Sequence, residues 1–568
     1  MKKLIAHLQR LDGQGYGAYK AIKGSYELPQ MRLVVDHVQG DPFAEPSHLR
    51  IFYSAHSAGW PSLQQADQVR ALEDYIGRRL AEHQSHAALA HAGSGKSGHI
   101  HFMHHGQQVL KRTAVKRDVD GVIEIRLQAG LPANGRRILG QQAQQLLLEH
   151  IPHWVRTYAT YKPTLHSTLT QHLNAVTDQV YLRNWLEQNQ HVAFIAQGSR
   201  LPRASGIDDH PLPHGTPFNA PDHLTLSIDL PHRGATQGVC IEQGITLLVG
   251  GGFHGKSTLL SALAQGVYDH IPGDGRELVV TRSDAASICA EEGRAVSGID
   301  IRPFINHLPT KRSTQNFVTS NASGSTSQAA NIMEALQGGS RLLLMDEDRA
   351  ATNLMMRDTC MQQLIAPHQE PITPLCEQIS TLHEQHAISM VVVMGGSSAF
   401  FPAAHRVWQF DTFQLVDRTA DAHQLVAPQT TRPTEVANLQ AALKQQRGAN
   451  PQILSPKKGK RAIAVKVPEP DLLNYGEVRI DLRHLEQRVD RGQTLAMGYM
   501  LAHFSQHLTM DDELLTALRA CYQQMVEQGM DKLTPFPLGN LALPRFLDLL
   551  AALNRHRGLI NHRMPSKP

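Results

Sequence analysis

Cysteine is scarce in this chain, and the cysteines present are poorly spaced for joint chemistry. There are five in 568 residues, an odd number, and no two lie closer than sixteen positions in the sequence. This spacing excludes the paired patterns of a structural zinc site and offers no disulfide framework. We therefore expect a cytoplasmic protein, because free thiols persist in a reducing compartment.

Long apolar runs are also missing. The longest, such as Met390–Met394, fall far short of the roughly 18–20 apolar residues that a membrane-spanning helix needs. The chain starts with two lysines, as a signal peptide would, but His7, Gln9 and Arg10 interrupt the apolar stretch that should follow. We expect neither a membrane span nor secretion.

Positive charge is modest overall and concentrated locally. The formal net charge is +4, yet residues 96–137 hold eight Lys or Arg against three acids. Two further basic patches lie at 457–461 and 555–567. Such patches bind polyanions if they share one face, whereas solvated loops on different faces would have no such role. The sequence leaves both readings open.

Composition and periodicity divide the chain into three parts. Residues 1–200 predict an α+β domain, partly basic, for which nucleic-acid binding is a candidate function. Residues 201–432 alternate short β-type runs with helices, as α/β domains with a mixed or parallel sheet do. Residues 433–568 predict a linker followed by a mainly helical domain. The expected strands of the middle part are 245–249, 277–281, 341–345 and 388–394, and residues 202–221 predict a linker or an excursion.

The middle part contains a phosphate-binding loop. The apolar run Leu247–Val249 leads into a GxxxxGKS segment and then an amphipathic helix, the context this motif requires. Glycine backbone N–H groups and the helix N-terminus would cradle phosphate oxygens, with Lys256 on the β- and γ-phosphates and Ser257 on Mg²⁺. The expected ATP-binding residues are Gly250, Gly251, Gly252, Phe253, His254, Gly255, Lys256, Ser257 and Thr258.

An acidic pair ends the apolar run 341–345. Charges directly after a buried strand are costly unless they serve a cation or a reaction. Asp346 is therefore expected to hold Mg²⁺, directly or through water, and Glu347 to act as the general base on the attacking water.

A Ser-Gly-Ser turn opens a helix between the two motifs. Ser323, Gly324 and Ser325 would form an anion cradle of N–H groups and hydroxyls, although an ordinary capped helix is the alternative. The order of P-loop, Ser-Gly helix and acidic strand resembles that of ABC ATPases, whose LSGGQ signature holds the corresponding place. Here the turn keeps only the central Ser-Gly of that signature.

Longer strings resemble one family, the soluble "predicted ATPases of the ABC class". Outside the motifs, the resemblance rests on VYDHIPGDGRE (267–277), AEEGR (290–294) and EPITPL (370–375). It continues through LDGQGYGAYKAIKG (11–24), DHVQGDPFAEPSHLR (36–50) and NYGEVRIDLRHLEQ (474–487). Almost the whole chain is covered.

The resemblance implies an ATPase whose sites are composite. In ABC proteins the P-loop of one protomer closes on the signature of the other, so one chain with one of each implies a head-to-tail homodimer with two ATPs. No membrane subunit is expected. The basic N-terminal stretch, with Lys111, Arg112, Lys116 and Arg117 as the proposed groove, makes nucleic acid the leading partner, and RNA is favoured because no DNA-reading motif is present. The alternative is a nucleotide-gated protein-binding clamp.

Two departures from standard ABC proteins concern the catalytic machinery. No histidine follows the run 388–394, where the switch histidine belongs; Gly395 and Gly396 stand there instead. The glutamine of the Q-loop is missing as well. Ser397, a backbone group, or an acid such as Glu291, Glu292 or Asp300 could take over these contacts.

Overall fold

A computed structural model describes residues 1–89, 93–365, 369–426, 436, 438–448 and 450–561. Its chain divides into two compact units, one formed by residues 1–177 and 528–543 and the other by 178–527 and 544–568. The predicted boundary between 432 and 433 falls outside the described residues, as does Arg563 of the C-terminal basic patch. The three-part division of the chain stays a prediction.

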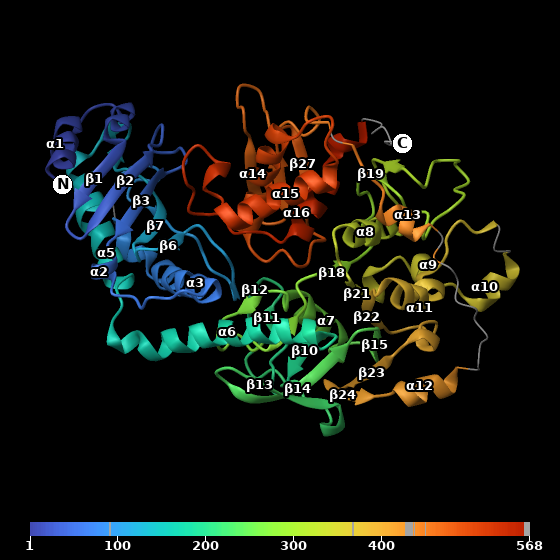
Figure 1. The fold of residues 1–568 in the computed structure, drawn as a ribbon. Helices are drawn as coiled ribbons and strands as arrows, with labels where there is room; N and C mark the ends of the chain where they lie inside the picture. Colours follow the sequence, from blue (N-terminus) through green and yellow to red (C-terminus); the bar gives the residue numbers. More distant parts are fainter. Residues whose placement is uncertain (90–92, 366–368, 427–435, 437, 449, 562–568) are drawn as a thin grey trace. The chain divides into compact units, whose positions relative to one another are not determined.

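The first unit is built on a six-stranded antiparallel sheet (Figure 1). The strands run in the order β1-β2-β3-β7-β4, with β6 also paired to β7. Strand β3 alternates buried and half-buried positions along its length, as expected where one face packs on a core. The elements are α1 Lys2–Leu11, a 3₁₀ turn at Tyr16–Ile22, β1 Gly24–Leu28, β2 Met31–His37, β3 Ser47–Tyr53, α2 Ala55–Ala58, α3 Ala66–Glu82, β4 Ile100–His101, β5 Gln108–Val109, β6 Val115–Arg117, β7 Ile123–Ala129, β8 Ala133–Asn134, β9 Arg137–Ile138, α4 Gly140–Gln145, α5 Ile151–Tyr158 and α6 His166–Gln188.

The second unit contains the predicted P-loop architecture. Its central sheet has the order β18-β21-β22-β15-β23-β24, parallel except for the last strand. The strands and the helices between them are β15 Ile245–Val249, α7 Lys256–Gln265, β18 Ala285–Ile288, α8 Gly324–Gln337, β21 Leu342–Asp346, α9 Thr352–Met355, α10 Thr359–Leu364, α11 Leu375–His386, β22 Ser389–Met394, β23 Arg406–Asp411 and β24 Gln414–Asp417. Three of the four expected strands are confirmed. Their residues are buried on both faces, which is why they read as unbroken apolar runs.

The fourth expected strand was misplaced. Residues 279–281 form β17, which pairs antiparallel with β10, outside the central sheet. Strand β18 takes the edge position next to β21 instead. A second sheet of order β13-β14-β10-β17 thus accompanies the first, and its strands are β10 His191–Ala196, β13 Thr225–Leu230, β14 Gly234–Glu242 and β17 Val279–Thr281. The segment expected as a linker or excursion, 202–221, contains a hairpin of β11 Arg203–Ser205 and β12 Asp208–Pro211.

The remaining part of the second unit is mainly helical, with a small sheet that the sequence did not indicate. The three antiparallel strands of this sheet precede the last three α-helices of the described chain. The elements are β19 Val296–Ile299, β20 Phe317–Thr319, α12 Thr419–Leu425, α13 Leu439–Leu443, β25 Val465–Glu469, β26 Leu472–Tyr475, β27 Val478–Asp481, α14 Arg491–His507, α15 Leu514–Gln528 and α16 Phe546–Asn554. Among the described residues, no helix is long and apolar enough to cross a membrane.

Candidate functional site

The P-loop joins the end of β15 to the start of α7. Gly250 and Gly255 have φ values of +129° and +101°, a region that favours glycine. A Cβ on Gly250 would also lie 2.4 Å from the carbonyl oxygen of Phe410, so a side chain has no room there. At Gly252 the space is open, which leaves the backbone accessible to a ligand.

The Lys256 side chain folds back over the P-loop. Its Nζ donates to the carbonyl oxygens of Gly250 at 2.7 Å and Gly251 at 2.6 Å, and the residue is buried. The ammonium therefore lies over the concave side of the loop, where phosphate oxygens would compete for it. The Nδ1 of His254 accepts from the Thr412 N–H at 3.0 Å, which ties the P-loop to the turn between β23 and β24.

The acidic pair lies at the same edge of the central sheet as the P-loop. Strand β22 separates β21 from β15, and Val393 is in register with both Asp346 and Leu248. Asp346 is buried, and its Oδ1 accepts from the Asp348 N–H at 3.1 Å. Its other carboxylate oxygen and the exposed Ser257 hydroxyl are hard oxygen donors, the chemistry that Mg²⁺ prefers.

Glu347 is held by the loop that lacks the switch histidine. Its Oε2 accepts from the Gly395 N–H at 2.6 Å and the Gly396 N–H at 3.0 Å. A Cβ on Gly396 would lie 3.3 Å from Oε1, so the glycine permits this close approach. Backbone groups, one of the replacements the sequence left open, therefore contact the expected general base.

The Ser-Gly turn caps α8, and one of its hydroxyls is bound within the chain. Ser323 is the N-cap, and its Oγ accepts from the Thr326 N–H. The Ser325 hydroxyl donates to Oδ1 of Asn353 at 2.7 Å. Among the described residues, no hydrogen bond or ion pair joins Ser323, Gly324 or Ser325 to the P-loop.

An apolar pocket that no sequence pattern predicted lies beside the P-loop. It has a volume of about 230 Å³, and Gly255 and Thr258 form part of its wall. Three aromatic rings line it, together with aliphatic and polar residues from the segment expected as a linker. The lining is completed by Leu201, Pro202, Leu212, His214, Gly215, Thr216, Phe218, Phe410 and Phe413. No local sequence motif predicts this pocket, because its walls come from chain segments about 200 residues apart.

The candidate acids Glu291 and Asp300 form ion pairs with arginine side chains. Asp300 forms an ion pair with Arg302 at 2.6 Å. Glu291 is buried and paired with Arg555, whose Nε donates at 3.2 Å. Burial raises the pKa of Glu291, but the charges of Arg555 and Arg294 outweigh that effect and hold it at about 2. Neither acid is free to replace a catalytic contact.

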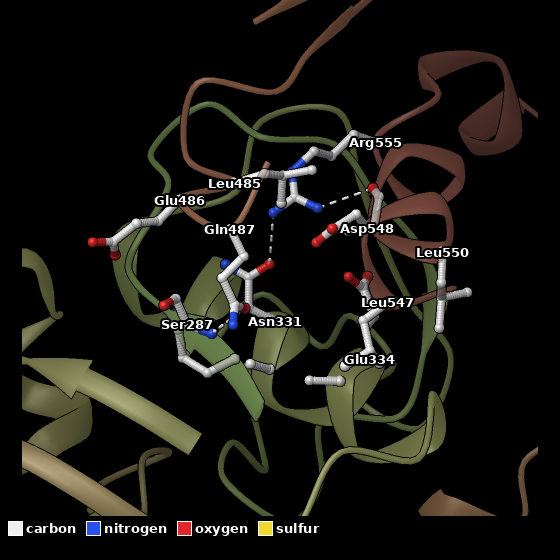
Figure 2. A pocket seen from close by; sticks show the side chains of 14 residues that line it. Ser287, Asn331, Glu334, Leu485, Glu486, Gln487, Leu547, Asp548, Leu550 and Arg555 are labelled. Atoms are coloured by element: carbon white, nitrogen blue, oxygen red, sulfur yellow. Dashed lines mark hydrogen bonds between the residues drawn. The ribbon is translucent and has the colours of Figure 1, made fainter. Parts of the chain in front are cut away.

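Glu291 and Arg555 belong to a buried polar network around α8. The Glu291 N–H donates to the Ser327 hydroxyl at 2.9 Å, and Asn331 donates to Oε1 of Glu291 at 2.9 Å. Figure 2 shows Arg555 above Asn331 at the edge of a small cavity, with a hydrogen bond of 3.3 Å between them. Arg557 donates to the carbonyl oxygens of Gly293 and Ser320. The segment after α16 thus binds the two loops that lead into the Ser-Gly helix.

Three of the four cations of the groove proposed in the first unit have partners within the chain. Arg112 is buried and forms an ion pair with Asp74 at 2.8 Å. Lys116 pairs with Asp531 at 2.8 Å, and Arg117 points a guanidinium nitrogen at the carbonyl oxygen of Leu63. These cations balance acids and backbone groups of their own unit. Charge spacing alone could not reveal this, because Asp531 lies more than 400 positions from Lys116.

Three protein-family models cover nearly the whole chain in sequence. A model described as "ATPase of the ABC class N-terminal" matches residues 1–162, and the P-loop domain of the ABC ATPases matches 165–447. The chain belongs to the predicted ATPases of the ABC class. A third model, described as the "MRB1590 C-terminal domain", matches residues 464–561 of this ATPase.

Individual relatives match only parts of the chain. The uncharacterized protein MJ1628 of Methanocaldococcus jannaschii is 33% identical over 190 residues, which cover 32% of this chain and 42% of that protein. A solved structure of cbiO1 from Clostridium perfringens, described as part of the ABC transporter complex cbiONQ, is 11% identical. It covers 35% of this chain and 88% of its own, with a TM-score of 0.23.

Proposed function

We propose that this ABC-class ATPase binds and hydrolyses Mg-ATP at an interface between two copies of the chain. The observation that carries the proposal is the shared sheet edge. The P-loop follows β15, Asp346 ends β21 with Glu347 directly after it, and β22 lies between these two parallel strands. Ser257 and Asp346 would hold Mg²⁺, which neutralises phosphate charge when bound. Lys256 exchanges its loop carbonyls for phosphate oxygens.

Glu347 takes the proton of the attacking water as the water oxygen bonds to the γ-phosphorus and ADP leaves. The Gly395 and Gly396 N–H groups orient the carboxylate for this task. Because these donors are backbone groups, the carboxylate can be oriented in a site that lacks the usual histidine.

The apolar pocket beside Gly255 and Thr258 suits the nucleotide base. Phosphates bound in the P-loop would bring the rest of the nucleotide to the neighbouring wall, where Phe410 and Phe413 offer aromatic surface. Ring stacking and exclusion of water favour a purine there.

The partner protomer would supply the Ser-Gly turn to the γ-phosphate. The exposed Ser323 at the N-terminus of α8 supports this arrangement, since none of the hydrogen bonds of the turn among the described residues goes to the P-loop of its own chain. ATP would close the pair and hydrolysis would reopen it.

Complementation between two inactive variants tests the composite site. Lys256→Ala removes the counter-cation of the phosphates, and Ser323→Arg places bulk and charge where the partner's γ-phosphate would lie. Each variant alone is expected to be inactive, whereas an exchanged mixture regains activity because one of its two interfaces is intact. Glu347→Gln should bind ATP and lose about 10²–10⁴-fold in turnover. Full turnover by Glu347→Gln, or no rescue after proven subunit exchange, contradicts the assignment.

The motion driven by ATP acts on nucleic acid in the cytoplasm, with RNA as the favoured partner. The N-terminal unit supports this with exposed cations outside the ion pairs described above, among them Lys20, Lys96 and Arg136. Binding that weakens steeply with added salt and is competed by polynucleotide is the expected result. Binding to an acidic protein that polynucleotide does not compete would instead favour the protein-binding clamp.

A further inference from the structure

Two family-specific strings of the N-terminal unit, 11–24 and 36–50, have no part in the ATPase site. The structure brings them together at one end of this unit. The Tyr16 N–H donates to the carbonyl oxygen of Arg136 at 2.8 Å, and Lys96 N–H donates to that of Pro42 at 2.8 Å. Three segments, around residues 16, 41 and 136, line an open hollow of about 600 Å³, and the loop around residue 95 is hydrogen-bonded to the second of them.

Glycine dominates the wall of this hollow without an internal reason. Gly15, Gly17 and Gly40 line it, and none of them has a positive φ. A Cβ at any of the three would meet no atom within 4 Å. Conformation and internal packing therefore both allow a side chain at these positions, and the glycines leave the backbone open to close approach by a ligand. Gly252 of the P-loop has the same open space.

Hydrogen bonds from two buried tyrosine side chains hold the wall of the hollow in place. Tyr16 and Tyr19 are buried, and their hydroxyls donate to the carbonyl oxygens of Leu131 at 3.1 Å and Pro132 at 2.7 Å. The hollow is therefore preformed, so a ligand would not have to order these loops on binding.

Two side chains that line the hollow, and a third on an adjoining turn, match the three parts of a ribonucleotide. Arg136 lines it, is exposed and has no acidic partner among the described residues, as a phosphate ligand would require. Asp41 uses only Oδ1 to accept from the Phe43 and Ala44 N–H groups, which leaves Oδ2 for a hydroxyl donor. Phe43 is 65% exposed on the same turn and presents a ring for base stacking.

We propose that this hollow, here called the glycine hollow, binds single-stranded RNA. The carboxylate of Asp41 disfavours an isolated anion but accepts from a ribose 2′-hydroxyl, the group that distinguishes RNA from DNA. Exposed Lys20, Lys96 and Arg137 extend the positive surface beyond the single nucleotide at Arg136. The inference rests on the proposed action on nucleic acid and gives it a location other than the 111–117 stretch.

Anisotropy of a fluorescein-labelled twelve-nucleotide oligo(U), titrated with the full-length protein at several salt concentrations, tests the inference. Arg136→Gln should bind about tenfold more weakly and reduce the log–log salt slope by roughly 0.7, the contribution of one phosphate contact on a single strand. Phe43→Ala should lose about fivefold or more through the missing stack. The matched oligo(dU) should bind more weakly than oligo(U) to the wild type.

Alanine at the glycines separates ligand contact from folding. Gly17→Ala with Gly40→Ala should weaken RNA binding while the melting temperature stays the same or rises, because alanine restricts the unfolded chain. Lys3→Gln removes an exposed cation of α1 that does not line the hollow, and Gly206→Ala fills open space in the other unit. Both controls should bind RNA, and all variants should hydrolyse ATP without RNA, as the wild type does.

The failures are distinguishable. If the wild type binds oligo(U) and all hollow variants bind equally well, the glycine hollow is not the site, while action on nucleic acid stands. If the wild type binds no oligo(U) even at low salt, the proposed nucleic-acid function fails and the inference with it. If uridine monophosphate competes as well as the oligonucleotide at equal phosphate concentration, the ligand is a free nucleotide and the assignment to RNA is wrong.

Discussion

The ion pair between Glu291 and Arg555 should hold the Ser-Gly helix α8 in place. Both residues are buried, and Glu291 also contacts α8 through Ser327 and Asn331. Removing one member of a buried pair leaves an uncompensated charge, which commonly costs about 3–5 kcal/mol. We therefore expect Arg555→Met to loosen α8.

The pKa of Glu291 gives an independent magnitude. It lies at about 2 against an ordinary value of 4.5, since the Arg555 and Arg294 charges outweigh the burial that raises it. At about 1.4 kcal/mol per pH unit, the difference corresponds to roughly 3 kcal/mol at neutral pH. Because the folded-state pKa is depressed, this stabilisation is present above pH 4.5 and disappears as the pH falls towards 2.

Hydrogen exchange of α8 measures the effect in the full chain. A loss of roughly 3 kcal/mol should accelerate exchange of the α8 amides about a hundredfold in Arg555→Met at neutral pH. The double variant Glu291→Met/Arg555→Met should be less affected than Arg555→Met alone, because no lone charge stays buried. Arg406→Met is the control, since its ion pair with Glu242 is exposed on both sides.

Two results would refute this reasoning. Unchanged α8 exchange in Arg555→Met would mean that the pair contributes nothing to the position of the helix. A double variant as strongly affected as the sum of the single variants would mean that packing, not the charge pair, matters. Glu291→Gln should also converge with the wild type as the pH falls from 4.5 towards 2, because the stabilisation by the ionised carboxylate is lost over that range.

Three further predictions concern the other parts of the chain. Gly396→Val should lower kcat about a hundredfold with little change in ATP affinity, because a side chain 3.3 Å from Glu347 Oε1 displaces the carboxylate; an unchanged kcat in steady-state assays contradicts its role. Phe413→Ala should raise the Kd for ATP about fivefold or more, measured by calorimetry, while inorganic triphosphate binds as before. Arg112→Met should lower the stability of the first unit by about 1–3 kcal/mol in thermal unfolding, because buried Asp74 loses one of its two arginine partners and keeps Arg78.

Much of the ATPase core was predictable from local patterns. The P-loop needs particular glycines, a lysine and flanking elements at fixed spacing, because backbone geometry dictates how a loop can cradle phosphate. Strands β15, β21 and β22 of the central sheet are buried on both faces, so they appear as continuous apolar runs in the sequence. Residues 279–281 have the same composition but pair with β10, since the pattern of a buried strand does not say which sheet it joins.

Partners distant in sequence were decided only by the tertiary structure. Nothing local indicates that Glu291 meets Arg555, 264 positions later, or that the Gly395 and Gly396 N–H groups hold Glu347. The pocket beside the P-loop likewise joins segments that are separate in sequence. The sequence determines which backbone conformations and faces are favourable, whereas the pairing of a charge depends on which opposite charge the fold brings within reach.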